Sequence, residues 1–207
     1  MKKAVPILKK VILVLFLLSL CVAGLCAYAM FGSNTADTDD ISYYRALTGE
    51  IDGASLTPIL GQSAYKTFLD LPALTELESY IDYRFNFTVR RYGLFRSHSA
   101  ILVVRYSDEG YTEEKMKLSQ KYTYLSEKIW GGGVVCDHSP VFSMDNFGFH
   151  AIEVAPDNYP KTMFFIGASD ERKEIAYIYF QDRDLDYISP SLQVFLMEET
   201  GWSKVAQ

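Results

Sequence analysis

The residue types best suited to chemistry gather in residues 131–150. Cys136, His138 and His150 lie there, and they include two of the three histidines of the chain. Thiolate and imidazole groups can bind zinc, and a histidine can lower the pKa of a cysteine thiol for nucleophilic attack. Eleven residues separate the two histidines, whereas structural zinc sites usually pair their ligands closely. We therefore treat these three residues as candidates for a catalytic or zinc site, with an ordinary loop and a buried cysteine as the alternative.

A second candidate is an acidic repeat at the spacing of the first calcium ligands of an EF-hand loop, formed by Asp182, Asp184 and Asp186. Tyr187 stands where that loop needs glycine, and Gln193 stands where it needs glutamate, so the full motif is absent. Three neighbouring carboxylates could still hold a calcium ion, and the alternative is a solvated turn. No other motif identifies a cofactor, and we expect none.

The elements that would position these residues belong to an antiparallel sheet. Apolar and polar residues alternate strictly over residues 81–90, which is typical of a strand with one solvated face. Further stretches rich in aromatic and β-branched residues predict strands at residues 100–106, 147–154, 163–168 and 174–180.

Helices are expected before and after the last three strands in the sequence. Apolar residues at helical spacing predict a helix over residues 112–129. Ser189 followed by Pro190 predicts the start of another helix, which Gly201 would end. Residues 41–71 favour one or two short helices. The predicted fold class is α+β, with an antiparallel sheet of about five strands and helices packed on one face.

The N-terminus has the form of a membrane-spanning or signal segment. Residues 1–10 carry four lysines and no acid, and residues 11–32 form an apolar run whose only polar member is Ser19. About 20 apolar residues cross a bilayer core, and lysines favour its cytoplasmic side. We therefore predict a single-pass anchor in the cell membrane with the C-terminal domain outside. The alternative is a secreted protein, because residues 27–29 have the small-x-small form of a signal-peptidase site and cleavage would follow Ala29.

Composition divides the chain after this segment. Residues 33–40 are small and polar and predict a flexible linker, and residues 41–207 are long enough for one extracytoplasmic α+β domain. Beyond the first 32 residues, 16 basic against 26 acidic residues give a net charge of −10. An acidic domain repels phosphate backbones, so we expect no nucleic-acid partner.

The lack of any catalytic signature in the sequence favours binding over catalysis. The chain holds 15 tyrosines and 13 phenylalanines, and tyrosine is common on binding faces as well as in cores. We expect a non-enzymatic binding or interaction module of the bacterial cell envelope, with the lipid bilayer contacted through residues 11–32 and an envelope protein or cell-wall component as partner. The alternative is a small secreted or membrane-anchored hydrolase or metal-dependent enzyme that uses the region of Cys136, His138 and His150.

Overall fold

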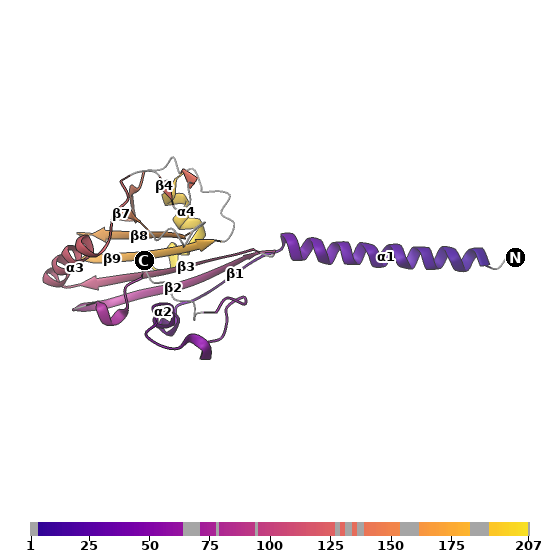
Figure 1. The fold of residues 1–207 in the computed structure, drawn as a ribbon, viewed down its shortest axis with the longest axis horizontal. Helices are drawn as coiled ribbons and strands as arrows, with labels where there is room; N and C mark the ends of the chain where they lie inside the picture. Colours follow the sequence, from indigo (N-terminus) through magenta and orange to yellow (C-terminus); the bar gives the residue numbers. More distant parts are fainter. Residues whose placement is uncertain are drawn as a thin grey trace.

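The computed structural model describes residues 4–63, 71–77, 79–93, 95–126, 129–130, 134–135, 139–153, 162–182 and 191–206. A long N-terminal helix projects from a domain built on one large sheet (Figure 1). The elements, in chain order, are α1 (Ala4–Phe31), β1 (Ser33–Thr38), α2 (Ile41–Leu47), η1 (Gly53–Ser55), η2 (Leu74–Glu76), β2 (Tyr80–Tyr92), β3 (Phe95–Tyr106), α3 (Asp108–Lys121), β4 (Ile129–Trp130), β5 (Val134–Val135), β6 (Val141–Met144), β7 (Phe147–Ile152), β8 (Thr162–Ser169), β9 (Glu174–Asp182), α4 (Leu192–Glu199) and η4 (Trp202–Lys204).

Helix α1 contains a stretch, Lys9–Ala27, that is long and apolar enough to cross a membrane. None of it is buried against the rest of the chain. A signal sequence near the N-terminus has the same properties. The predicted apolar segment is therefore a continuous exposed helix.

The sheet confirms the predicted α+β class and its antiparallel pairing. Its strand order is β1-β2-β3-β9-β8-β7-β6, and every neighbouring pair is antiparallel. Seven strands replace the five that were expected. The two additional strands, β1 and β6, lie at the edges of the sheet. Edge strands are often short or polar, so they lack the hydrophobic pattern by which the inner strands were predicted.

Strand β1 occupies most of the segment expected to be a flexible linker. Residues 33–38 pair with β2 in continuous register, from Ser33 opposite Tyr92 to Thr38 opposite Phe87. Pairing of this kind needs only backbone N–H and C=O groups. A polar composition therefore did not prevent strand formation beside a well-formed partner. Only Gly32 separates this strand from α1.

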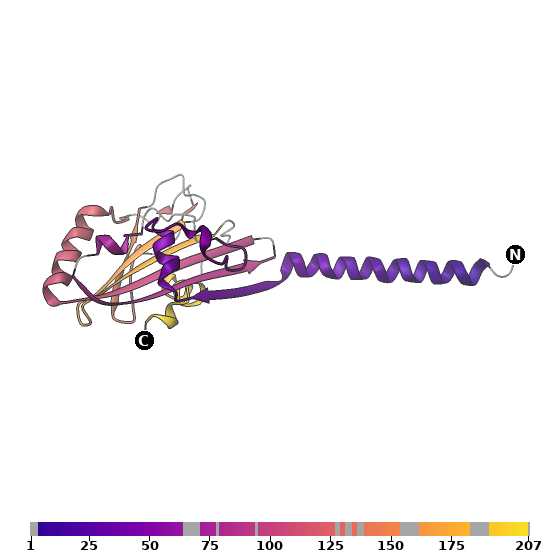
Figure 2. The same cartoon turned by 90° about the horizontal axis from the view of Figure 1, so that it is seen from below.

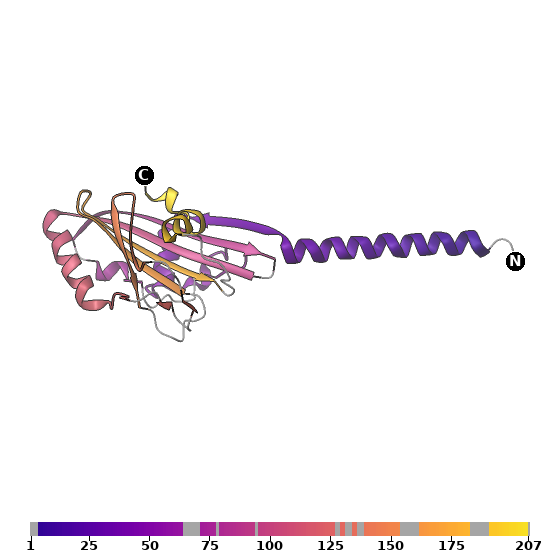
Figure 3. The same ribbon diagram turned by 90° about the horizontal axis from the view of Figure 1, so that it is seen from above.

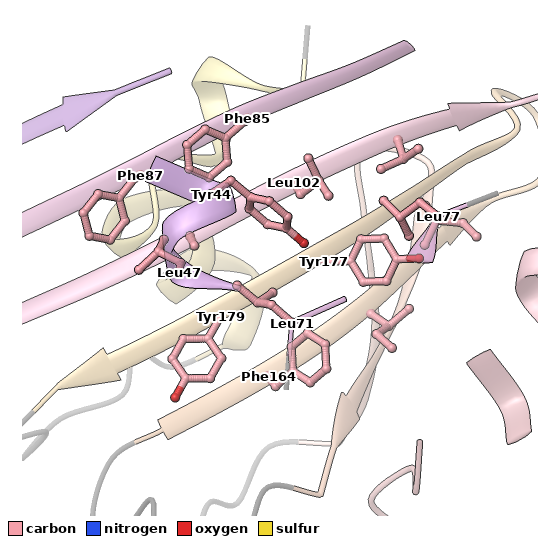
Figure 4. Close-up of a cluster of buried hydrophobic side chains, with 14 of the residues drawn as sticks. Tyr44, Leu47, Leu71, Leu77, Phe85, Phe87, Leu102, Phe164, Tyr177 and Tyr179 are labelled. Carbon is pink, nitrogen blue, oxygen red and sulfur yellow. The ribbon is translucent and has the colours of Figure 1, made fainter. Parts of the chain in front are cut away.

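The sheet is covered on both faces, which corrects the prediction that helices pack on one face. One face lies under α2 and α3, where the buried core includes Tyr44, Phe87 and Tyr177 (Figure 4). The opposite face lies under α4 and η4, where the core includes Phe195 and Trp202. Figures 2 and 3 show α4 on the side of the sheet away from α2. We call these the α2 face and the α4 face.

The polar side of β2 is an interface with the C-terminal segment rather than a solvated surface. Asn86 and Thr88 are 2% and 4% exposed. A Cβ added at Gly201 would lie 2.9 Å from the side-chain nitrogen of Asn86 and from the hydroxyl of Thr88. Arg84 Nε donates a hydrogen bond of 2.6 Å to the carbonyl of Val205. The alternation over residues 81–90 predicted the strand correctly but could not reveal what covers its polar side.

Helix α3 begins and ends earlier than the predicted helix over residues 112–129. It starts after Ser107, whose hydroxyl accepts a hydrogen bond from Gly110 N at 3.1 Å, as an N-cap does. It ends at Lys121, after which Tyr124 bridges to Ile152 in β7. Tertiary pairing with the sheet therefore interrupts an apolar spacing that continues in the sequence.

Helix α4 lies within the predicted C-terminal helix but starts after a different cap. Ser191 caps it, since its hydroxyl accepts a hydrogen bond from Val194 N at 3.2 Å. The predicted start at Ser189 and Pro190 lies outside the described residues. Gly201 follows the helix with a φ of 71°, a left-handed conformation that glycine adopts without strain.

Candidate binding pocket

The described structure contains one of the three candidate catalytic or zinc-binding residues. His150 lies on β7, is exposed, and packs its ring edge-to-face against Tyr124 at a centroid distance of 5.1 Å. Cys136 and His138 lie outside the described residues. Whether these three side chains converge stays a prediction.

The acidic repeat is likewise described only at its first member. Asp182 ends β9, where it pairs in register with Ser97 of β3. Asp184 and Asp186 lie outside the described residues. Within the described ranges, no group of three or more His, Cys, Asp or Glu side chains is placed to hold a metal ion.

A pocket of about 340 Å³ opens on the α2 face, where α2, the start of η2 and the start of β2 meet. The side chains around it combine aromatic rings, aliphatic groups, one cation and one carboxylate. They belong to Ile41, Arg45, Glu50, Leu74, Thr75, Tyr80 and Tyr83. The two aromatic rings and the aliphatic groups of this lining offer apolar contact surface, and Arg45 offers a positive charge.

A β-bulge places the two tyrosines of the pocket side by side. Tyr80 pairs with Tyr106 and Asp82 with Arg105, so Ile81 is an extra residue in β2. Residues three apart point to opposite faces of a regular strand, but a bulge re-aims the side chains around it. The rings of Tyr80 and Tyr83 consequently meet edge-to-face, with centroids 6.0 Å apart.

Ile81 itself differs from its predicted place. Strict alternation over residues 81–90 placed it on the core face with Phe85 and Phe87, whereas its side chain is 66% exposed. The bulge displaces it from the core. Bulges are over-represented beside functional sites. This end of β2 is therefore a candidate position for a functional site.

The backbone before the bulge adopts an uncommon conformation. Ser79 has a φ of 57°, in the left-handed region that non-glycine residues seldom occupy. Its carbonyl oxygen lies 3.3 Å from the position that a Cβ on Gly110 would take. The start of β2 is thus seated closely against the first turn of α3, and Gly110 leaves the room for it. Such conformations cost on the order of 1 kcal/mol and persist where the surrounding fold imposes them.

Glu50 holds two walls of the pocket together. Its carboxylate accepts hydrogen bonds from Leu74 N and Thr75 N, both at 3.1 Å, and from the Thr48 hydroxyl at 3.0 Å. These bonds tie η2 to the residues that follow α2. Because both carboxylate oxygens are engaged, Glu50 serves as a structural brace.

Tyr44 fixes the same wall from the core side. Its hydroxyl donates a hydrogen bond of 2.6 Å to the carbonyl of Pro72, just before η2. Burial raises the pKa of Tyr44 well above its ordinary value, and the nearby Tyr122 and Glu50 add to the rise. The hydroxyl therefore stays protonated and able to donate at physiological pH.

Arg45 is the cation of the pocket lining. It lies in the last turn of α2, four residues after Ile41, so the two side chains share one side of the helix. Its side chain is exposed, and within the described part of the chain its guanidinium forms no hydrogen bond or ion pair. The five N–H groups of a guanidinium match a carboxylate in a two-point hydrogen-bonded pair.

Reading the sequence alone did not identify any of these pocket residues. Five of the seven come from residues 41–75, where the hydrophobic pattern is weakest, and the other two depend on a bulge. The abundance of tyrosine was the one signal that pointed toward a binding surface. No family model, no curated protein and no solved structure was found to match this chain.

Proposed function

We propose that this chain is a membrane-anchored binding module of the bacterial cell envelope, whose pocket receives an acidic peptide segment of a partner protein. The observation that carries the proposal is the pair formed by Tyr80 and Tyr83, which a bulge turns into a common pocket with Arg45. Helix α1 would provide the anchor.

The anchor part of the proposal is supported by α1 and its flank. Lys9–Ala27 is exposed along its whole length, which would be unfavourable in water for so apolar a helix. The four lysines of residues 1–10 favour the cytoplasmic side, so the domain would lie outside. If a peptidase instead cut after Ala29, the chain would retain β1 and every pocket residue. The binding proposal is therefore the same for the anchored and secreted forms.

The ligand class follows from the chemistry of the pocket walls. Tyrosine rings offer large rigid contact area with little loss of conformational freedom on binding. Arg45 offers charge-assisted hydrogen bonds to a carboxylate, each contributing about 1.5–3 kcal/mol. The walls are held in place by Glu50 and Tyr44, so little has to be ordered when the ligand enters. A peptide segment with an acidic group next to a flat or apolar group fits this arrangement.

A small probe tests this recognition directly. Hippurate carries a carboxylate next to an amide-linked aromatic ring, and hippuramide is its neutral counterpart. Calorimetric titration of the full-length protein in detergent micelles should show hippurate binding about tenfold more tightly than hippuramide, a difference of about 1.4 kcal/mol. The Arg45→Gln variant should lose this preference, because the carboxylate partner is gone.

Matched variants separate recognition from general charge effects. Arg91→Gln removes an exposed arginine from the end of β2 opposite Tyr80 and Tyr83, and it should leave hippurate affinity as in the parent. Tyr83→Leu should weaken hippurate and hippuramide alike, because both use the ring. Equal hippurate affinities for the parent and Arg45→Gln would contradict the proposed function. Urea unfolding should show that Arg45→Gln changes stability by no more than about 0.5 kcal/mol, as expected for an exposed site.

A further inference from the structure

The turn of the β2–β3 hairpin lies directly beside the end of α1. Gly93 N donates a hydrogen bond of 2.7 Å to the carbonyl of Gly32, the residue that joins α1 to β1. The next pair along the strands is Ser33 with Tyr92. In Figures 2 and 3, the ends of β2 and β3 reach the point where α1 begins to project. The hairpin turn and the end of α1 thus lie at the same position along the axis of α1.

Two aromatic side chains stand exposed at this turn. Tyr92 and Phe95, which pair across the hairpin, are 60% and 51% exposed. Tyr92 lies opposite Ser33, the residue that follows the end of α1 and Gly32, and core packing leaves both rings uncovered. Tyrosine and tryptophan rings are enriched at the level of lipid headgroups, and phenylalanine packs at the headgroup and acyl-chain boundary in interfacial segments.

The charge of the hairpin differs from that of the domain that carries it. Residues 83–107 contain five arginines and no acidic residue, although the chain beyond α1 has a net charge of −10. Three of the five, Arg84, Arg90 and Arg105, form ion pairs with Glu174 or Glu199. The other two, Arg91 and Arg96, pair across the hairpin next to the exposed rings. Basic groups close to a membrane surface are attracted to anionic lipids by about 1 kcal/mol each.

The length of α1 sets the depth of the turn. Lys9–Ala27 is 19 residues long, or about 28 Å of helix at about 1.5 Å per residue, close to the roughly 30 Å of a hydrocarbon core. The five steps from Ala27 to Gly32 add about 7 Å, which reaches the headgroup region that brings a bilayer to about 40–45 Å. The hydrogen bond between Gly93 and Gly32 holds the hairpin turn at that depth.

From this geometry we infer that Tyr92 and Phe95 of the hairpin turn lie in the headgroup region of the bilayer that α1 crosses. We call this contact between the hairpin turn and the lipid the seat of the domain. This inference rests on the anchoring part of the proposed function. With no flexible linker between α1 and β1, the seated domain has one orientation. Strands β1 to β3 run roughly along the direction of α1 (Figure 1), so β2 would lead away from the lipid. Its 13 residues extend over about 40 Å, which places Tyr80 and the pocket at the far end.

Bromolipid quenching of tryptophan fluorescence tests the seat in the full-length chain. The chain is reconstituted in vesicles of phosphatidylcholine and phosphatidylglycerol, with or without bromine on the acyl chains near the headgroup. Phe95→Trp should lose roughly half of its added fluorescence in the brominated vesicles, because an indole at this level settles in the headgroup region. The emission of the native tryptophans is subtracted with the parent chain in the same vesicles.

Tyr80→Trp is the matched control, since it replaces a partly exposed aromatic at the opposite end of the β2–β3 hairpin. It should not be quenched. Flotation of the vesicles reports the anchor separately from the seat. A chain that floats with the vesicles while Phe95→Trp stays unquenched would overturn the seat and leave the anchor intact, and it would indicate that a second protein copy or water covers these rings. A chain that does not float would overturn the anchor and the seat together.

Discussion

Among the described residues, each face of the sheet buries one glutamate, and the two glutamates have different surroundings. On the α4 face, Glu174 is fully buried and binds the guanidinium of Arg84 at 3.0 and 3.1 Å and that of Arg105 at 2.9 Å. On the α2 face, Glu114 is 4% exposed and accepts a hydrogen bond of 3.1 Å from the Tyr177 hydroxyl. One carboxylate is bound by two guanidinium groups, whereas the other accepts a hydrogen bond from a neutral hydroxyl and has one lysine, Lys117, at 3.8 Å.

This difference reflects what covers each face. The C-terminal segment lies over the polar side of β2, and it is bound there through charged side chains and backbone carbonyls, such as Arg84 to Val205. The core of the α2 face is rich in tyrosines, whose hydroxyls reach backbone or carboxylate oxygens, as those of Tyr44 in α2 and Tyr177 in β9 do. The pocket opens on the tyrosine-rich face. Stability should therefore depend on charge mainly on the α4 face and on protonated hydroxyls mainly on the α2 face.

The largest expected effect comes from removing the buried ring of Trp202 from the core of the α4 face. Trp202 is fully buried, its ring meets those of Phe147 and Phe149 edge-to-face at 5.4 Å, and its Nε1 donates a hydrogen bond to Asp145. Trp202→Ala should lower the free energy of unfolding by about 3–5 kcal/mol, as for other large-to-small aromatic substitutions in cores. Urea unfolding followed by circular dichroism measures it.

The control for that substitution is Trp202→Phe, which keeps most ring contacts and loses the hydrogen bond. It should cost about 1–2 kcal/mol. A change below about 1 kcal/mol for Trp202→Ala would mean that the C-terminal segment is not part of the cooperative core.

The next prediction compares how much stability is lost when each buried carboxylate loses a cationic partner. Arg84→Met removes a two-point partner of Glu174 and should lower the free energy of unfolding by about 2–3 kcal/mol, because the carboxylate would then rely on the more exposed Arg105. Lys117→Met removes the cation 3.8 Å from Glu114 and should cost less than about 0.5 kcal/mol, as expected for an exposed lysine. Equal losses for the two variants would remove the distinction between the faces.

The smallest effect concerns pH and the tyrosines of the α2 face. Burial raises the pKa of Tyr177 and Tyr44 well above their ordinary value, which is about 10. Above that pH the unfolded chain releases protons that the folded chain keeps, so the free energy of unfolding falls as pH rises. Each such tyrosine contributes a slope of about 1.4 kcal/mol per pH unit. The effect is absent below about pH 9, where both states hold the proton.

Tyr177→Phe tests the assignment of this slope. It should cost about 1 kcal/mol at neutral pH, through the lost bond to Glu114, and should make the alkaline decline shallower. Tyr92→Phe, at an exposed position, is the matched control for loss of one hydroxyl. Urea midpoints measured from pH 8 to about pH 11 would contradict the assignment if Tyr177→Phe declined as steeply as the parent.

The inner part of the fold was predictable because its sequence signals are local. Alternation through Phe85, Phe87 and Val89 predicted β2, and the aromatic and β-branched stretches predicted β3, β7, β8 and β9. The edge strands were missed because backbone pairing supports β1 without any apolar side chain. The cover on the α4 face was missed because Asn86 and Thr88 look like solvated residues until Gly201 packs on them.

The candidate pocket was not predictable for a different reason. It depends on an extra residue at Ile81, a left-handed backbone at Ser79 and the seating of that turn on Gly110. None of these has a distinctive composition, and the contact of Ser79 with Gly110 joins residues far apart in the sequence. The predicted chemistry at Cys136, His138 and His150 stays a prediction.

The central claim is that α1 crosses a membrane and holds the domain outside the cytoplasm. A membrane-impermeant amine reagent applied to intact protoplasts or spheroplasts tests it, with the labelled lysines located by mass spectrometry. We expect the exposed lysines of α3, Lys115, Lys117 and Lys121, to be labelled before lysis, and the lysines of residues 1–10 only after lysis. Protection of the α3 lysines until the cells are broken would contradict the account.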